Sequence, residues 1–142
     1  MKKIKTILIL SLAAAMLFMA GCVSSTAQSI KVGEDEIPSL YSIIGEKKIT
    51  GTETNTENDI KSTTVTYEPG SITEREAVDY MLELIASHGF SIQQDAIEQE
   101  NGKYYQLTKD SETDGKYIVV SLYVEEEGST VIKYMVGGVD IL

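Results

Sequence analysis

The chain has 142 residues, of which 22 are acidic and 12 are basic, and its formal net charge at pH 7 is −10. Such an acidic chain repels polyanions, so we expect no nucleic-acid partner. It contains one cysteine, which excludes a disulfide within the chain.

Residues 1–21 have the layout of a cleaved secretory signal peptide. Lys2, Lys3 and Lys5 precede an uncharged, largely apolar stretch at positions 6–20. A helix over residues 7–19 would be only about 20 Å long, short of the roughly 30 Å hydrocarbon core of a bilayer. Removing residues 1–21 leaves nine basic and 22 acidic residues, a net charge of −13.

Met19, Ala20 and Gly21 directly precede the cysteine, Cys22. This stretch resembles the lipobox of small bacterial lipoproteins, with Met19 where leucine is usual. The resemblance implies cleavage before Cys22, a diacylglyceryl group on its thiol and further acylation, for example with palmitate, at the new amino terminus. Since two acyl chains anchor a protein stably, it also implies a lipid-anchored protein on the extracytoplasmic face of the cell membrane. An ordinary signal peptide with Cys22 as a free thiol is the alternative.

The composition of residues 22–39 predicts a lipidated tether. Residues 23–39 have few large apolar side chains, a Ser/Thr-rich start and an acidic run at 34–36. Such a segment buries too little apolar area to offset its ordering entropy. Residues 40–142 are then long enough for a single domain with one core.

The elements of that domain follow from local patterns. Two Thr-, Ile- and Tyr-containing stretches between residues 40 and 68 predict a β-hairpin. Thr73 and Glu76 form a capping-box pattern ahead of apolar residues at helical spacing, and Gly89 is placed to end the helix, which we expect over residues 73–88.

Turn pairs at Asn101-Gly102 and Asp114-Gly115 and the loop 125–129 separate four further strand-like stretches. The resulting order, ββ-α-ββββ, predicts an α+β domain: an antiparallel sheet with one amphipathic helix packed on one face.

The turn at residues 110–117 resembles the opening of an EF-hand calcium loop. Asp110, Glu112 and Asp114 alternate ahead of a glycine, and hard cations bind clustered carboxylates. The twelfth position of such a loop would be Ser121 instead of a bidentate glutamate, and the flanks read as strands. We therefore interpret the turn as an acidic hairpin turn and keep its three carboxylates only as weak metal candidates.

Other chemistry-bearing residues have ordinary structural explanations. His88 lies in the last helical turn, where a cationic imidazole is favoured. The run Glu125-Glu126-Glu127 fits a solvated loop. Five tyrosines of the predicted meander either form a binding face or are simply half-buried strand residues: Tyr104, Tyr105, Tyr117, Tyr123 and Tyr134.

The sequence contains no glycine-rich phosphate loop, dinucleotide fingerprint or nucleophile elbow. We therefore expect no enzymatic activity and no cofactor. The expectation is a lipid-anchored, non-catalytic binding or interaction module, attached to the membrane through Cys22, with a protein or small-molecule partner that the sequence leaves unnamed, as it does the oligomeric state. The alternatives are a small carboxylate-dependent envelope hydrolase and a weak calcium-binding structural protein.

Overall fold

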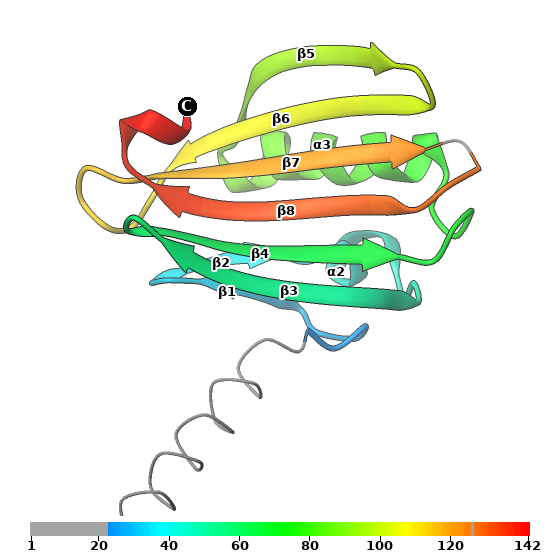
Figure 1. Cartoon of the computed structure of the whole chain (residues 1–142), viewed down its shortest axis with the longest axis horizontal. Coiled ribbons are helices and arrows are strands. Elements are labelled where there is room, and N and C mark those ends of the chain that lie inside the picture. Colours follow the sequence, from blue (N-terminus) through cyan, green and yellow to red (C-terminus); the bar gives the residue numbers. More distant parts are fainter. Residues whose placement is uncertain (1–22, 126) are drawn as a thin grey trace, which may run out of the picture.

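The computed structural model of the chain describes residues 23–125 and 127–142, and its elements form one large sheet with a second layer on one face (Figure 1). In chain order the elements are β1 (Ser29–Val32), β2 (Asp35–Pro38), α2 (Leu40–Ile44), β3 (Ile49–Glu57), β4 (Ile60–Tyr67), α3 (Glu74–His88), β5 (Ser91–Gln99), β6 (Gly102–Asp110), β7 (Tyr117–Glu125), β8 (Thr130–Gly137) and the 3-10 helix η1 (Val139–Ile141).

The large sheet has six strands in the order β3-β4-β8-β7-β6-β5, and every neighbouring pair is antiparallel. Strands β5 to β8 form a meander, and β8 closes against β4 from the earlier hairpin. The prediction of a mixed protein dominated by antiparallel sheet is confirmed. The predicted order ββ-α-ββββ is not matched exactly. The strands β1 and β2 come before the residues that it describes, and Leu40–Ile44, expected to begin the first strand-like stretch, form the helix α2 behind an N-cap at Ser39.

The tether predicted over residues 22–39 is wrong for residues 29–38. Strands β1 and β2 pair in register around a turn at Gly33 and Glu34, and Gly33 has a positive φ of 62°. Ile30, Val32 and Ile37 are at most 3% exposed. A hairpin of four-residue strands points three apolar side chains to the same side, which suffices to dock it on the core although its overall composition is polar.

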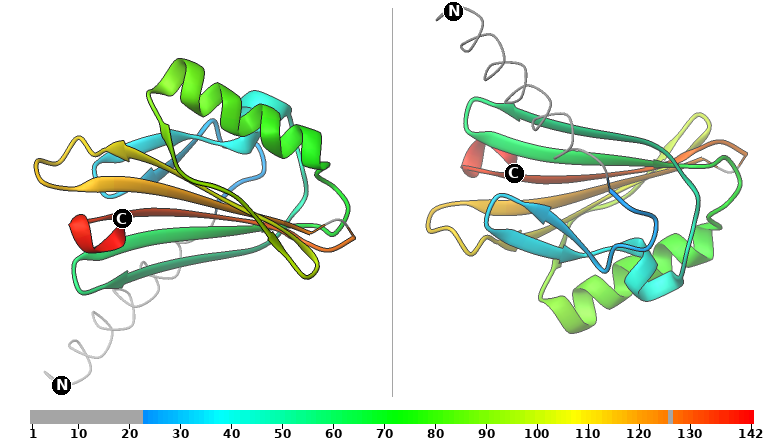
Figure 2. Two further views of the ribbon diagram at one scale, coloured as in Figure 1. Left: turned by 90° about the horizontal axis from the view of Figure 1, so that it is seen from above. Right: turned by 90° about the horizontal axis from the view of Figure 1, so that it is seen from below.

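The second layer is built from α3, α2 and the β1–β2 hairpin, all on the same face of the large sheet (Figure 2). Helix α3 begins with the predicted capping box, in which Thr73 accepts from the backbone N–H of Glu76 at 3.1 Å and Glu76 accepts from that of Thr73 at 3.0 Å. Its Gly89 C-cap is left-handed. A single helix was expected on this face; one helix is too narrow for six strands, and the hairpin and α2 cover the remainder.

The core between the layers contains two fully buried tyrosines, Tyr80 of α3 and Tyr134 of β8. Their hydroxyl groups lie 2.9 Å apart, and the Tyr80 hydroxyl donates to the carbonyl of Pro38 at 2.7 Å. Burial raises the pKa of both phenols, so both stay neutral. The pair ties helix, sheet and hairpin together through satisfied polar groups.

Candidate functional site

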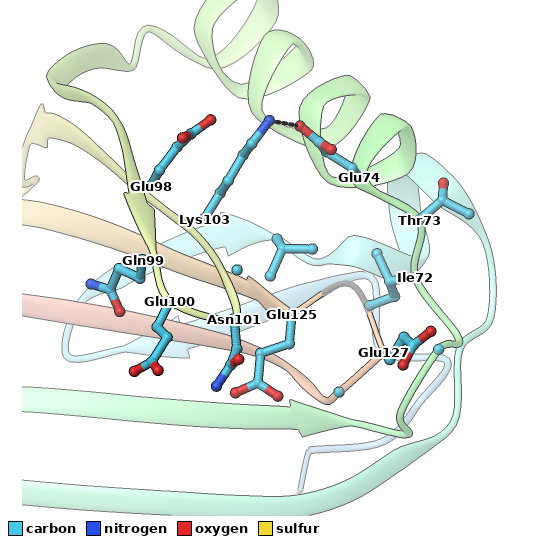
Figure 3. Close-up of a pocket in the computed structure, with 14 residues that line it drawn as sticks. Ile72, Thr73, Glu74, Glu98, Gln99, Glu100, Asn101, Lys103, Glu125 and Glu127 are labelled. Carbon is cyan, nitrogen blue, oxygen red and sulfur yellow. Dashed lines mark hydrogen bonds and ion pairs between the residues drawn. The ribbon is translucent and has the colours of Figure 1, made fainter.

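An open cleft of about 980 Å³ lies at one end of the large sheet (Figure 3). Its walls come from the start of α3, the β5–β6 turn, the end of β7 and the loops on either side of Gly70 and Gly128. The lining residues are Gly70, Ile72, Thr73, Glu74, Glu98, Gln99, Glu100, Asn101, Gly102, Lys103, Val124, Glu125, Glu127 and Gly128. Its volume lies at the upper end of the range typical of ligand sites.

The β5–β6 turn brings two of the cleft's glutamates to this end of the sheet. Gln99 pairs with Gly102, so Glu100 and Asn101 form the two-residue turn between the strands. Gly102 also pairs with Glu125 of β7, and a Cβ at Gly102 would lie 2.2 Å from the carbonyl oxygen of Val124. Only glycine permits this approach, which brings the β5–β6 turn and the end of β7 together at the cleft.

The cleft is acidic: among the residues that the structure describes, five glutamates and one lysine line it, a local charge of −4. The lysine, Lys103, bonds to the carboxylate of Glu74 at the start of α3, and this hydrogen bond raises the pKa of Lys103. The carboxylates of Glu98 and Glu100 have no such partner among the described residues and are exposed. The site can therefore accept positive charge at low desolvation cost.

Two tyrosines next to the cleft, Tyr105 and Tyr123, have raised pKa values, and glutamates of the cleft contribute to both shifts. The pKa of Tyr105 is raised by burial and by the nearby carboxylate of Glu74. The pKa of Tyr123 is raised by desolvation and by Glu125. Both phenols stay protonated at neutral pH, so the negative charge of the cleft comes from carboxylates alone.

The weak metal candidates lie at the opposite end of the sheet, because β6 runs from Gly102 at the cleft to Asp110 at the 110–115 turn. There Asp35 holds the turn. Its carboxylate, in a residue only 2% exposed, accepts from the Ser111 hydroxyl at 2.5 Å and from the Glu112 backbone N–H at 2.8 Å. Within residues 23–125 and 127–142, no three His, Cys, Asp or Glu side chains gather as a metal-binding group.

The five tyrosines do not share one face. The strand register places Tyr105 and Tyr134 on the covered face, and Tyr104 and Tyr123, which pair directly, on the uncovered face. The Tyr104 hydroxyl lies 3.1 Å from the Ser121 hydroxyl and 3.2 Å from the side-chain oxygen of Gln106. Tyr117 is six residues before Tyr123 in β7 and shares its face. The contacts of Tyr104 are those of a strand residue packed against its neighbours.

The histidine, the cysteine and the glutamate run lie in three different parts of the chain. His88 ends α3 and is half-buried. Cys22 and Glu126 lie outside the described residues, while Glu125 and Glu127, on either side of the latter, both line the cleft. The sequence did not indicate that the carboxylate of Asp35 is buried. It also did not indicate that Glu98 and Glu100 line a cleft. The alternation around Gly33 was the one available signal for the hairpin that carries Asp35.

No protein-family model matches the chain, and no curated protein matches it. Among the helices formed by residues 23–125 and 127–142, none combines the length and the apolar character needed to cross a bilayer. The described residues thus form a sheet-dominated mixed fold with an open acidic cleft at one end of its large sheet.

Proposed function

We propose that the protein is a non-catalytic binding module, held at the extracytoplasmic face of the cell membrane by lipid on Cys22, that takes a positively charged peptide segment into its acidic cleft. One observation carries the ligand class. Five glutamates from three separate parts of the chain line one cleft, and its one lysine is already bonded to Glu74. Opposite charges in a lined cleft attract and orient a cationic partner.

The exposure of the carboxylates favours binding over hydrolysis. A glycoside hydrolase needs two carboxyl groups in different environments, one of them shielded so that it stays protonated. In the cleft, Glu74, Glu98, Glu100 and Glu127 are exposed and Glu125 is half-buried. Exposed carboxylates suit electrostatic contact with a basic partner, and they leave the hydrolase alternative without a shielded acid among them.

The membrane attachment is supported by the resemblance of residues 19–22 to a lipobox. Two or more acyl chains on the mature amino terminus give stable anchoring, whereas a single chain gives only marginal binding. A Cys22→Ser variant should therefore leave the membrane fraction, while the unaltered protein stays there until detergent is added. Membrane association of the variant that still requires detergent for release would contradict the attachment.

Charge-matched variants test the cleft. The triple variant Glu98→Gln, Glu100→Gln and Glu127→Gln removes three cleft charges, and the control Glu36→Gln, Glu53→Gln and Glu57→Gln removes three exposed charges outside it. We expect the cleft variant to bind an oligolysine peptide about tenfold more weakly, since three contacts of roughly 0.5 kcal/mol each are lost. The control should change far less at physiological salt, because remote charges are screened.

Equal losses in the two variants would mean that net charge alone attracts the peptide, and would contradict a site in the cleft. The same comparison at high salt should abolish the difference. Circular dichroism and urea unfolding of both variants check that the fold is unchanged, since all six positions are exposed.

A further inference from the structure

The chain enters the fold without a spacer after Cys22. Val23, covalently joined to Cys22, packs partly buried against the hydrophobic core. Two residues on, the Ser25 hydroxyl donates to a carboxylate oxygen of Glu46 at 3.0 Å. Because consecutive Cα atoms are about 3.8 Å apart, a lipid on the residue before Val23 would have no further residues between its attachment residue and the folded domain.

The point of entry lies at one edge of the large sheet. Val23 and Ser25 border a shallow hollow of about 470 Å³ together with Glu46, Lys48 and Ile49. Ile49 is the first residue of β3, the edge strand. Strand β5 forms the other edge, five strand spacings or roughly 24 Å away (Figure 1).

The surface around the hollow, here called the entry corner and consisting of Val23, Ser25, Glu46, Lys48 and Ile49, has the chemistry of a membrane-contacting surface. Val23 and Ile49 are apolar, and the Lys48 side chain is 71% exposed. Its amino group is 3.8 Å from the nearest oxygen of Glu68, a loose pair that leaves it accessible. The carboxylate of Glu46 balances the charge of Lys48 in this corner. Apolar side chains beside one accessible cation and one anion suit the zwitterionic headgroup region of a bilayer.

Two of the cleft's glutamates lie toward the other edge. Glu98 belongs to β5, and Glu100 lies in the turn that follows it. An orientation with β3 toward the bilayer keeps these carboxylates away from anionic headgroups and open to the extracytoplasmic space.

From these observations, and resting on the proposed lipid attachment at Cys22, we infer that the entry corner lies directly against the phospholipid headgroups. The β3 edge then sits at the bilayer, and the β5 edge points away from it. The anchor thus sets the orientation of the whole sheet and presents the acidic cleft to partners outside the membrane.

Site-specific fluorescence tests the orientation in the lipidated, full-length mature protein. Because the Cys22 thiol is consumed by lipid, a cysteine introduced by Lys48→Cys or by Gln94→Cys becomes the single labelling site; position 94 is exposed on β5. Each labelled protein is reconstituted into phosphatidylcholine vesicles containing a nitroxide-headgroup lipid. We expect several-fold stronger quenching at position 48 than at position 94.

A variant with an added spacer tests whether the short connection to the anchor sets the orientation. A flexible Gly/Ser insert of about twelve residues between Cys22 and Val23 would let the domain move roughly 20 Å from the anchor. It should remove most of the difference between positions 48 and 94 while the protein stays in the vesicles.

The outcomes separate the two proposals. Equal, weak quenching at both positions in a protein whose mass shows lipid on Cys22 would overturn the orientation and leave the anchor standing. A mass without lipid, together with loss from the vesicles, would overturn the anchor and the orientation with it.

Discussion

The two ends of the large sheet are both rich in acidic residues, yet they differ in what the acids contact. At one end, the turn at 110–115 is held by the buried carboxylate of Asp35, and Lys116 pairs with Asp59 at 3.1 Å. At the other end, glutamates from the β5–β6 turn and the end of β7 surround an open cleft with one lysine among them.

This difference shows that carboxylates at the two ends of one sheet can have opposite roles, the buried Asp35 against the exposed glutamates of the cleft. Where backbone N–H and hydroxyl donors surround a carboxylate, it holds the local backbone in place, and its oxygens are already occupied by hydrogen bonds and cannot bind a ligand. Where carboxylates meet mainly solvent and one another, they are held in place by the strands and stay free to bind.

Asp35→Ala should destabilise the protein most. The change leaves the Ser111 hydroxyl and the Glu112 N–H without their acceptor in a buried position and loosens the β1–β2 hairpin from the turn. We expect a loss of about 2–3 kcal/mol in the free energy of unfolding, measured with urea. The neighbouring exposed residue supplies the control: Glu36→Ala should stay within about 0.5 kcal/mol. Similar values for the two variants would remove the structural role of Asp35.

Gly102→Ala should disturb the cleft end by a steric route. The added methyl group would lie 2.2 Å from the carbonyl oxygen of Val124, so the β5–β6 turn must move away from β7. We expect a loss of about 2 kcal/mol, with weaker binding of an oligolysine peptide. In Gly51→Ala the nearest atom is an ordinary 3.8 Å from the new methyl group, so this change should be neutral. A neutral Gly102 variant would contradict the close approach of the strands.

Glu76→Gln should reduce the change in the free energy of unfolding between neutral and acid pH. The backbone hydrogen bond from Thr73 and then the contact with Lys47 lower the pKa of Glu76 in the folded state. Its contribution is therefore present above the unfolded pKa, near 4.5, and is lost as the pH falls through the lower folded value.

The Glu76→Gln effect should be about 0.5 kcal/mol at neutral pH, because the side chain is partly solvent-screened. Urea unfolding at pH 7 and pH 3 measures it. Lys47→Met keeps the Thr73 hydrogen bond and should retain most of the pH dependence. If Lys47→Met abolishes the dependence instead, the capping box is not its main source.

Addition of calcium should have the smallest effect. It concerns the end of the sheet at which Asp35 holds the 110–115 turn. The turn there is already organised by hydrogen bonds to Asp35, and the described residues hold no metal-binding group of three. We expect no saturable shift of the amide resonances of Asp110, Glu112 and Asp114 at millimolar calcium. A saturable shift confined to these residues would restore the calcium alternative.

The sequence predicted the parts of the fold that depend on short-range patterns. The capping box of α3 and its glycine end lie within residues 73–89. In the strands, apolar and polar side chains alternate with a period of two residues, which is visible in the sequence. The β1–β2 hairpin was missed because a few apolar side chains docked on a distant core outweigh an acidic composition, and no local pattern reports that docking.

The cleft was missed for a related reason. Glu98 and Glu125 are far apart in the chain and meet only because β6 pairs with both β5 and β7. With 22 acidic residues in the chain, a list of carboxylates does not show which of them converge. The register of the strands supplies that information, and the register is set by the whole sheet.

Mass spectrometry of the protein extracted from its own membranes determines whether lipid is attached at Cys22. We expect a chain that begins at Cys22 and carries a diacylglyceryl group on sulfur. A chain that still begins at Met1, or one that begins at Cys22 with a free thiol, would contradict this expectation.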